Sequence, residues 1–185
     1  MDKDLLKKLL TQNTLVIDGG VESAVGAYIF DSLQELKSRG NPPIELTIAS
    51  NGGDVTVGLD IYDMLATYPG VINGTVVGYA RSMGVIILQA CNRRLAHQHA
   101  RLLIHHVSRR QVNLDILVSQ KRLAKTVTEM QRQQQFLYRI LAGKTKRTIP
   151  QIRKACSLDK DMSAEEALVF GLIDEITPVR TKSPT

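Results

Sequence analysis

The sequence contains no tryptophan, and aromatic residues make up only 4% of its 185 residues. Aliphatic side chains must therefore pack most of the core. Long apolar runs are also missing: none reaches the roughly 20 residues of a membrane-spanning helix, so we expect no membrane association. Residues 1–10 alternate charged residues with leucine pairs, which predicts an amphipathic helix rather than a signal peptide.

Cysteine is equally scarce. Cys91 and Cys156 are too few for a disulfide framework, and they lack the spacing of metal ligands. Cys91 lies in an apolar run and is predicted to be a buried free thiol, which fits a reducing compartment such as the cytoplasm. We predict no metal and no organic cofactor.

The charge balance does not indicate a nucleic-acid-binding protein. Lysine and arginine exceed aspartate and glutamate by 24 to 18, giving a net charge of +6. The basic residues are spread along the chain, which is typical of a solvated surface. With 43% apolar and 23% charged residues, the chain is expected to form one soluble domain over residues 1–185.

The first half of the chain alternates strand and helix patterns, which predicts an α/β fold of stacked βαβ units. Strands are expected at residues 15–17, 44–48 and 70–77, and helices at 23–38, 55–67 and after Ser82. The second half predicts a strand at 101–104, a long helix at 113–141 stopped by Gly143, a short helix from Thr148, a capping box at Ser163 and a strand at 172–176.

Ser82 stands between a β-branched apolar strand and an apolar helix, in the stretch Gly78-Tyr79-Ala80-Arg81-Ser82-Met83-Gly84. A sharp turn there would push the hydroxyl outward and leave the first N–H groups of the helix unpaired. Such a turn suits a nucleophilic serine, since those N–H groups can bind a developing negative charge. The alternative is an ordinary helix N-cap.

A glycine-rich loop follows the strand at residues 44–48. Gly52 and Gly53 allow a backbone N–H to approach a ligand closely, and the N–H groups of Gly53 and Met83 could together form an oxyanion hole. A plain strand-to-helix turn is the alternative. The loop lacks the Gly-x-Gly-x-x-Gly fingerprint of dinucleotide binding.

His105 stands at the end of the strand at 101–104 and is the candidate general base. His106 is its neighbour, and strand alternation would put the two on opposite faces. A third group must orient the base, and Asp159 and Asp161 are both candidates that spacing alone does not separate.

Four motifs in this order resemble the Clp protease proteolytic subunit, a caseinolytic serine peptidase family. They are the segment from Ser50 to Asp63, the Gly-x-Ala-x-Ser-Met-Gly motif at 78–84, the strand ending in His105, and the Ser-Ala-x-Glu-Ala…Gly-Leu-Ile-Asp pattern at 163–174. The resemblance implies a crotonase- or Clp-protease-like fold with a protruding handle helix, in a handle region of about residues 106–147.

The resemblance also implies a mechanism. Ser82 falls on the family nucleophile, His105 on its base and Asp159 on its catalytic aspartate, which selects Asp159 over Asp161. Gly53 and Met83 fall on its oxyanion donors. The implied activity is ATP-dependent proteolysis: a serine endopeptidase cleaving peptides or unfolded proteins inside a heptameric ring or double ring of identical subunits.

Three departures from the family bear on partners. An AAA-type unfoldase is implied, but its docking positions fall near Glu45, Thr47 and Thr67, whose polar side chains disfavour burial of an apolar partner loop. The N-terminal segment is shorter than in the family, and residues 106–111 replace a Gly-rich stretch. A non-proteolytic ring subunit partnering an active paralogue is therefore an alternative. A crotonase-type acyl-CoA enzyme is another, disfavoured by the complete Ser-His-Asp set.

Overall fold

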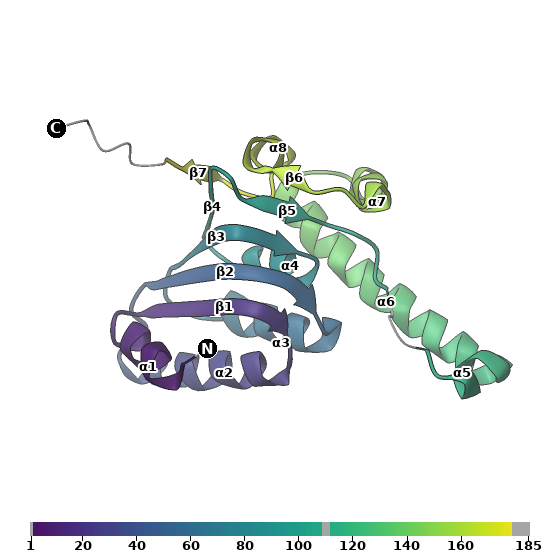
Figure 1. The fold of residues 1–185 in the computed structure, drawn as a ribbon, viewed down its shortest axis with the longest axis horizontal. Coiled ribbons are helices and arrows are strands. Elements are labelled where there is room, and N and C mark those ends of the chain that lie inside the picture. The colour runs from purple at the N-terminus through teal and green to yellow at the C-terminus, as the bar shows by residue number, and fades with distance from the viewer. Residues whose placement is uncertain (1, 109–111, 179–185) are drawn as a thin grey trace. The chain divides into compact units, whose positions relative to one another are not determined.

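The computed structural model in Figure 1 describes residues 2–108 and 112–178. The chain forms two compact units: the first contains Met1–Ile104 and Lys160–Thr185, and the second is the intervening stretch His105–Asp159. The altered segment at 106–111 is described as far as Ser108, and residues 109–111 lie outside the described part.

A mostly parallel sheet forms the centre of the first unit. Its strands are β1 (Thr14–Val21), β2 (Ile44–Gly53), β3 (Ile72–Arg81), β4 (Arg93–His97), β5 (Arg101–Leu103), β6 (Met162–Ser163) and β7 (Glu175–Thr177). They follow the order β1-β2-β3-β4-β7, and β5 pairs with both β3 and β6. The β5–β6 pair is antiparallel, whereas the other pairs are parallel. The predicted α/β class is confirmed.

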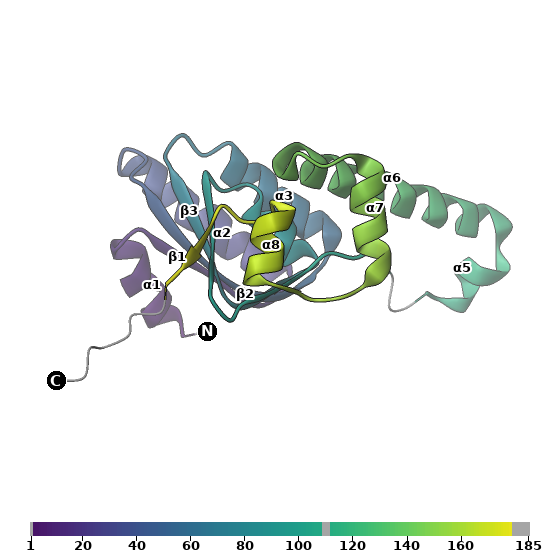
Figure 2. The same ribbon diagram turned by 90° about the horizontal axis from the view of Figure 1, so that it is seen from above.

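Helices supply the apolar layer against this sheet. The first unit contains α1 (Lys3–Thr11), α2 (Ser23–Ser38), α3 (Val55–Ala66), α4 (Met83–Leu88) and α8 (Ala164–Phe170). Contacts join α2 to β1 and α3, α3 to α4, and α4 to β2 and β3. The helix α8, labelled in Figure 2, contacts β5, β6 and β7. All six residues of α4 are buried, so the helix that follows Ser82 is enclosed on every side.

The second unit is helical. It contains α5 (Leu114–Val118), α6 (Gln120–Thr145) and α7 (Ile149–Leu158). Its buried side chains lie at the end of α6 and on α7: Leu137, Tyr138, Leu141, Thr145, Ile152 and Cys156. No helix in residues 2–108 and 112–178 is long and apolar enough to cross a membrane.

Local signals located several elements well. The helix predicted at 23–38 is α2, the capping box at Ser163 joins its hydroxyl to the Glu166 N–H at 3.1 Å, and Gly171 ends α8 with φ 92°. Both cysteines are buried, as predicted for Cys91.

Other boundaries were wrong. The helix after Ser82 is short and ends at Leu88, and a strand that was not predicted, β4, begins at Arg93. Ser119 adopts an extended conformation that divides the long helix into α5 and α6. Gly143 lies inside α6, because the buried neighbours Leu141 and Thr145 hold the helix there. The last strand begins at Glu175 rather than at residue 172.

Strand β4 was not predicted because one of its two buried side chains, that of Arg94, is charged. Arg94 is only 8% exposed, and its guanidinium bonds the carboxylate of Asp174, the side-chain oxygen of Gln89 at 2.7 Å and the carbonyl of Gly171 at 2.9 Å. A buried charge is tolerated only when it is paired and hydrogen-bonded in this way. Arg94 thereby ties β4 to the C-terminal segment.

Replacing Arg94 with alanine is expected to lower the free energy of unfolding by about 3 kcal/mol, because three acceptors lose their donor. Urea denaturation measures this. The control is Arg93→Ala, whose ion pair with Glu175 at 2.6 Å is largely exposed. That change should cost under about 1 kcal/mol. Equal losses in the two variants would contradict the structural role of Arg94.

Candidate functional site

Ser82 has a strained backbone. It lies between β3 and α4 with φ 52° and ψ −122°, a region that residues with a side chain rarely adopt. Its N–H donates to the carbonyl of Leu103 at 2.9 Å, and its carbonyl accepts from Val85 at 3.1 Å. Its hydroxyl makes no capping hydrogen bond to the helix. The N-cap alternative is therefore wrong for the hydroxyl, which is left for another role.

Gly52 lies directly against Ser82. It has φ 85°, and a Cβ atom there would lie 2.6 Å from the Ser82 Cβ and 2.9 Å from the Met83 nitrogen. A Cβ on Gly53 would lie 2.3 Å from the carbonyl oxygen of Val21. Both positions therefore demand glycine for close approach, and Gly52 also for its positive φ.

A buried serine that the sequence analysis did not single out organises the Gly52 turn. The Ser50 hydroxyl donates to the Gly19 carbonyl at 2.6 Å and accepts from the Gly52 N–H at 3.1 Å. Ser50 is fully buried, and it shares its strand with Gly52. The hydrogen bond thus fixes the turn from inside the sheet.

The backbone N–H groups of Gly53 and Met83 were predicted to donate hydrogen bonds to an oxyanion. The Asp54 N–H donates to the Val21 carbonyl at 2.8 Å. Gly53 is the last residue of β2 and pairs with Val21 of β1. Met83 begins α4, and an N–H in the first turn of a helix has no acceptor within that helix.

Arg81 precedes Ser82 and makes three hydrogen bonds. Its Nε and Nη2 donate to the two carboxylate oxygens of Asp161 at 2.9 and 2.8 Å, and its Nη1 donates to the side-chain oxygen of Asn51 at 3.0 Å. The hydrogen bond from Arg81 holds the pKa of the Asp161 carboxyl below its usual value. Asp161, one of the two candidates for orienting the base, is therefore engaged by Arg81.

The second unit contains the other predicted residues. His105 is its first residue and is half-buried, outside β5, which ends at Leu103. The expected strand alternation of His105 and His106 therefore does not apply. Asp159 is its last residue, exposed, and ends α7 in the left-handed conformation with φ 45°. The predicted triad is thus divided, with Ser82 in the first unit and His105 and Asp159 in the second.

His106 has a structural role inside the second unit. Its Nδ1 lies 2.8 Å from the Tyr138 hydroxyl, and its Nε2 lies 3.0 Å from the Ser157 hydroxyl. Both ring nitrogens are engaged, which leaves His105 as the candidate base of the pair. Because Ser157 is two residues before Asp159, this hydrogen bond also ties the start of the unit to its end.

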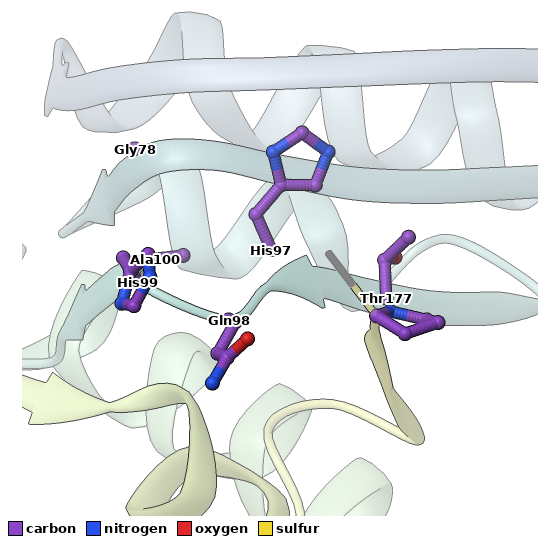
Figure 3. A pocket seen from close by; sticks show the side chains of 7 residues that line it. Gly78, His97, Gln98, His99, Ala100 and Thr177 are labelled. Carbon is purple, nitrogen blue, oxygen red and sulfur yellow. The ribbon is translucent and has the colours of Figure 1, made fainter. Parts of the chain in front are cut away.

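A cavity of about 360 Å³ lies elsewhere in the first unit (Figure 3). Its lining includes Gly78, His97, His99, Ala100 and Thr177, and none of the predicted site residues. Within the described ranges, no group of three or more His, Cys, Asp and Glu side chains could hold a metal ion.

A family model described as Clp protease matches residues 1–180 of the 185. The match confirms the predicted resemblance, and it extends over both compact units. Membership of this family supports a peptidase.

Replacing Gly52 with alanine is expected to displace Ser82, because the new Cβ would lie 2.6 Å from the Ser82 Cβ. Labelling by a serine-directed fluorophosphonate should be lost. The matched control is Gly40→Ala, which shares the positive φ, 86°, but has no atom within 4 Å of its Cβ. Both variants should lose about 1–2 kcal/mol of stability from backbone strain. Gly52→Ala should lose more, because its Cβ also overlaps its neighbours. Loss of labelling in both would contradict the contact argument.

The lowered pKa of Asp161 predicts an acid-sensitive contribution to stability. The carboxylate stabilises the folded state at pH values above its unfolded pKa of about 4, and that stability is lost as the pH falls through the folded pKa. Urea unfolding of wild type and Asp161→Asn should therefore differ by under about 1 kcal/mol at pH 7, and the difference should shrink as the pH falls below about 4. A difference independent of pH would contradict it.

Proposed function

We propose that this chain, which belongs to the Clp protease family, is a serine endopeptidase with Ser82 as nucleophile, His105 as general base and Asp159 as the group that orients it. The family match over both units supports its action as a single domain over residues 1–185, with a handle region at about 106–147.

The conformation of Ser82 carries this proposal. A positive φ at a serine costs on the order of 1–3 kcal/mol, and such strain clusters at functional sites. The hydroxyl does not cap α4, so helix capping does not account for the strain. A nucleophile held at a sharp strand-to-helix turn does account for it.

In the proposed reaction, the Ser82 oxygen attacks the scissile carbonyl while His105 accepts its proton. Asp159 accepts a hydrogen bond from the imidazole and favours its charged form. His105 then protonates the leaving amine, the C–N bond breaks, and an acyl-serine remains. Water, deprotonated by His105, attacks the acyl group. The ester C–O bond breaks, His105 returns the proton to the Ser82 oxygen, and the acid is released. The N–H groups of Gly53 and Met83 bind the oxyanion, each donor contributing about 3 kcal/mol.

Chain connectivity supports the assignment of His105 and Asp159. Leu103, whose carbonyl accepts the Ser82 N–H, lies two residues before His105. Asp161, which pairs with the neighbour of Ser82, lies two residues after Asp159. The second unit therefore leaves and rejoins the first close to residues bonded at the Ser82 turn.

We also propose that the peptidase works as a ring of identical subunits in the cytoplasm. Apolar side chains on α5 and α6 are exposed: Leu114, Leu117, Val118, Leu123, Val127 and Phe136. They give the handle region a surface that a second subunit would bury. An AAA-type unfoldase is the expected partner of the family, but Glu45 is exposed and bonded to Asn73 at 2.7 Å, which disfavours an apolar docking loop there.

Ser82→Ala should abolish both hydrolysis of a short fluorogenic peptide and labelling by a fluorophosphonate, because the attacking oxygen is gone. Asp159→Asn should lower kcat by about 10⁴-fold, since the imidazole then adopts the wrong tautomer. Steady-state kinetics and gel fluorescence measure these effects.

The control for Ser82→Ala is Ser38→Ala, an exposed serine at the end of α2 that bonds only its own helix at 2.7 Å in the described contacts. It should behave as wild type. Labelling that survives Ser82→Ala would refute the assignment. Assembly of the wild type into a ring, seen by native mass spectrometry, without any labelling would favour the non-proteolytic subunit.

A further inference from the structure

We infer that Arg81 is a positioning residue for this reaction, acting through a guanidinium clamp that joins Arg81, Asn51 and Asp161. The inference rests on the proposed function of Ser82. All three residues lie in the first unit, at the ends of β2 and β3 and just before β6.

The clamp joins segments that are remote in the sequence. Arg81 and Asp161 are 80 residues apart, and Arg81 and Asn51 are 30 apart. Two parallel hydrogen bonds to one carboxylate fix both the distance and the orientation of the guanidinium. The third nitrogen then determines where the Asn51 side chain lies.

Each clamp residue is next to a component of the proposed site. Arg81 directly precedes the strained Ser82, and Asn51 directly precedes Gly52, which abuts Ser82. Asp161 directly precedes β6. The partner strand of β6 is β5, and its residue Leu103 supplies the carbonyl that accepts the Ser82 N–H. One guanidinium thus holds three segments whose relative placement sets the nucleophile against the oxyanion donors.

The clamp contributes orientation rather than much stability. The Arg81 and Asp161 side chains are 38% and 35% exposed, and ion pairs at such positions add little to folding free energy. The pKa of Asp161 is held low by Arg81, so the pair stays charged at neutral pH. The strained turn at Ser82 persists only if the residues around it are fixed, and the two parallel hydrogen bonds to Asp161 fix Arg81.

Arg81 acts through its neighbours and does not contact the reacting atoms itself. Nε, Nη1 and Nη2 all have protein acceptors, and the guanidinium carbon lies 5.7 Å from the centroid of the Tyr79 ring. The charge is directed toward Asp161 and Asn51 in these contacts. Three of the five guanidinium N–H groups, one on each nitrogen, are thus engaged within the protein.

The test compares Arg81→Met, Arg81→Lys and Asp161→Asn in the full-length protein. Arg81→Met should lower the rate of fluorophosphonate labelling and kcat by about tenfold or more, because small displacements of reacting groups are costly. KM for a short peptide should change by less than about twofold, since the clamp does not contact substrate. Asp161→Asn should act in the same direction, and the double variant should be no worse than Arg81→Met, since the two residues act as a unit.

Arg81→Lys separates geometry from charge. Lysine keeps the positive charge but lacks the planar fork, so it should resemble Arg81→Met rather than wild type. Activity near the wild-type level in Arg81→Lys would overturn the geometric clamp.

The matched control is Arg93→Met, which removes an exposed ion pair at the start of β4. Its labelling rate should stay within about twofold of wild type, because surface pairs remote from a site contribute little. If Arg81→Met does not fold, Asp161→Asn carries the same test. Wild-type labelling with unchanged rates in the clamp variants overturns this inference alone. Absence of labelling in the wild type refutes the proposed function, and this inference with it.

Discussion

The close approach of Gly52 to Ser82 is the constraint on which the first unit depends. No side chain fits at position 52, because a Cβ there would lie within 3 Å of atoms of Ser82, Arg81 and Met83. The ends of β2 and β3 must therefore carry a glycine and a sharp turn together. Two sets of hydrogen bonds hold this contact: the Ser50 hydroxyl accepts from the Gly52 N–H, and Arg81 donates to Asn51.

The strain at Ser82 is offset by the packing of the helix α4 that follows it, whose residues are all buried. Met83 is fully buried, and a Cβ on Gly58 of α3 would lie 2.5 Å from its side chain. A Cβ on Gly84 would likewise lie 3.1 Å from the carbonyl oxygen of Ser50. Burial of apolar surface in α4 thus offsets the cost of one unfavourable backbone conformation.

Sequence periodicity could predict the elements whose apolar pattern is local. The helix α2 and the strand β2 present regular buried faces, and the Ser163 capping box and Gly171 mark α8 from both ends. Strand β4 could not be found in this way, because Arg94 faces inward and its partner Asp174 is 80 residues away. The break between α5 and α6 at Ser119 could not be predicted either, because no glycine or proline marks it in the sequence.

The same limit applies to the candidate site. Ser82, Gly53 and Met83 stand out from their local motifs, whereas the roles of Arg81 and Ser50 depend on contacts between distant segments. Neither a serine inside a strand nor an arginine before a turn forms part of a periodic pattern, so the sequence does not reveal these roles. The resemblance distinguished Asp159 from Asp161, and the pairing of Asp161 with Arg81 gives a physical reason to separate them.

The antiparallel pairing of β5 with β6 has a consequence for how this chain can vary. Arg101 pairs with Ser163 and Leu102 with Met162, so the entire second unit is an excursion between two neighbouring strands. The entropic cost of closing such an excursion grows only with the logarithm of its length. The helices within it can therefore be lengthened, shortened or exchanged, while the flanking strands β5 and β6 remain paired.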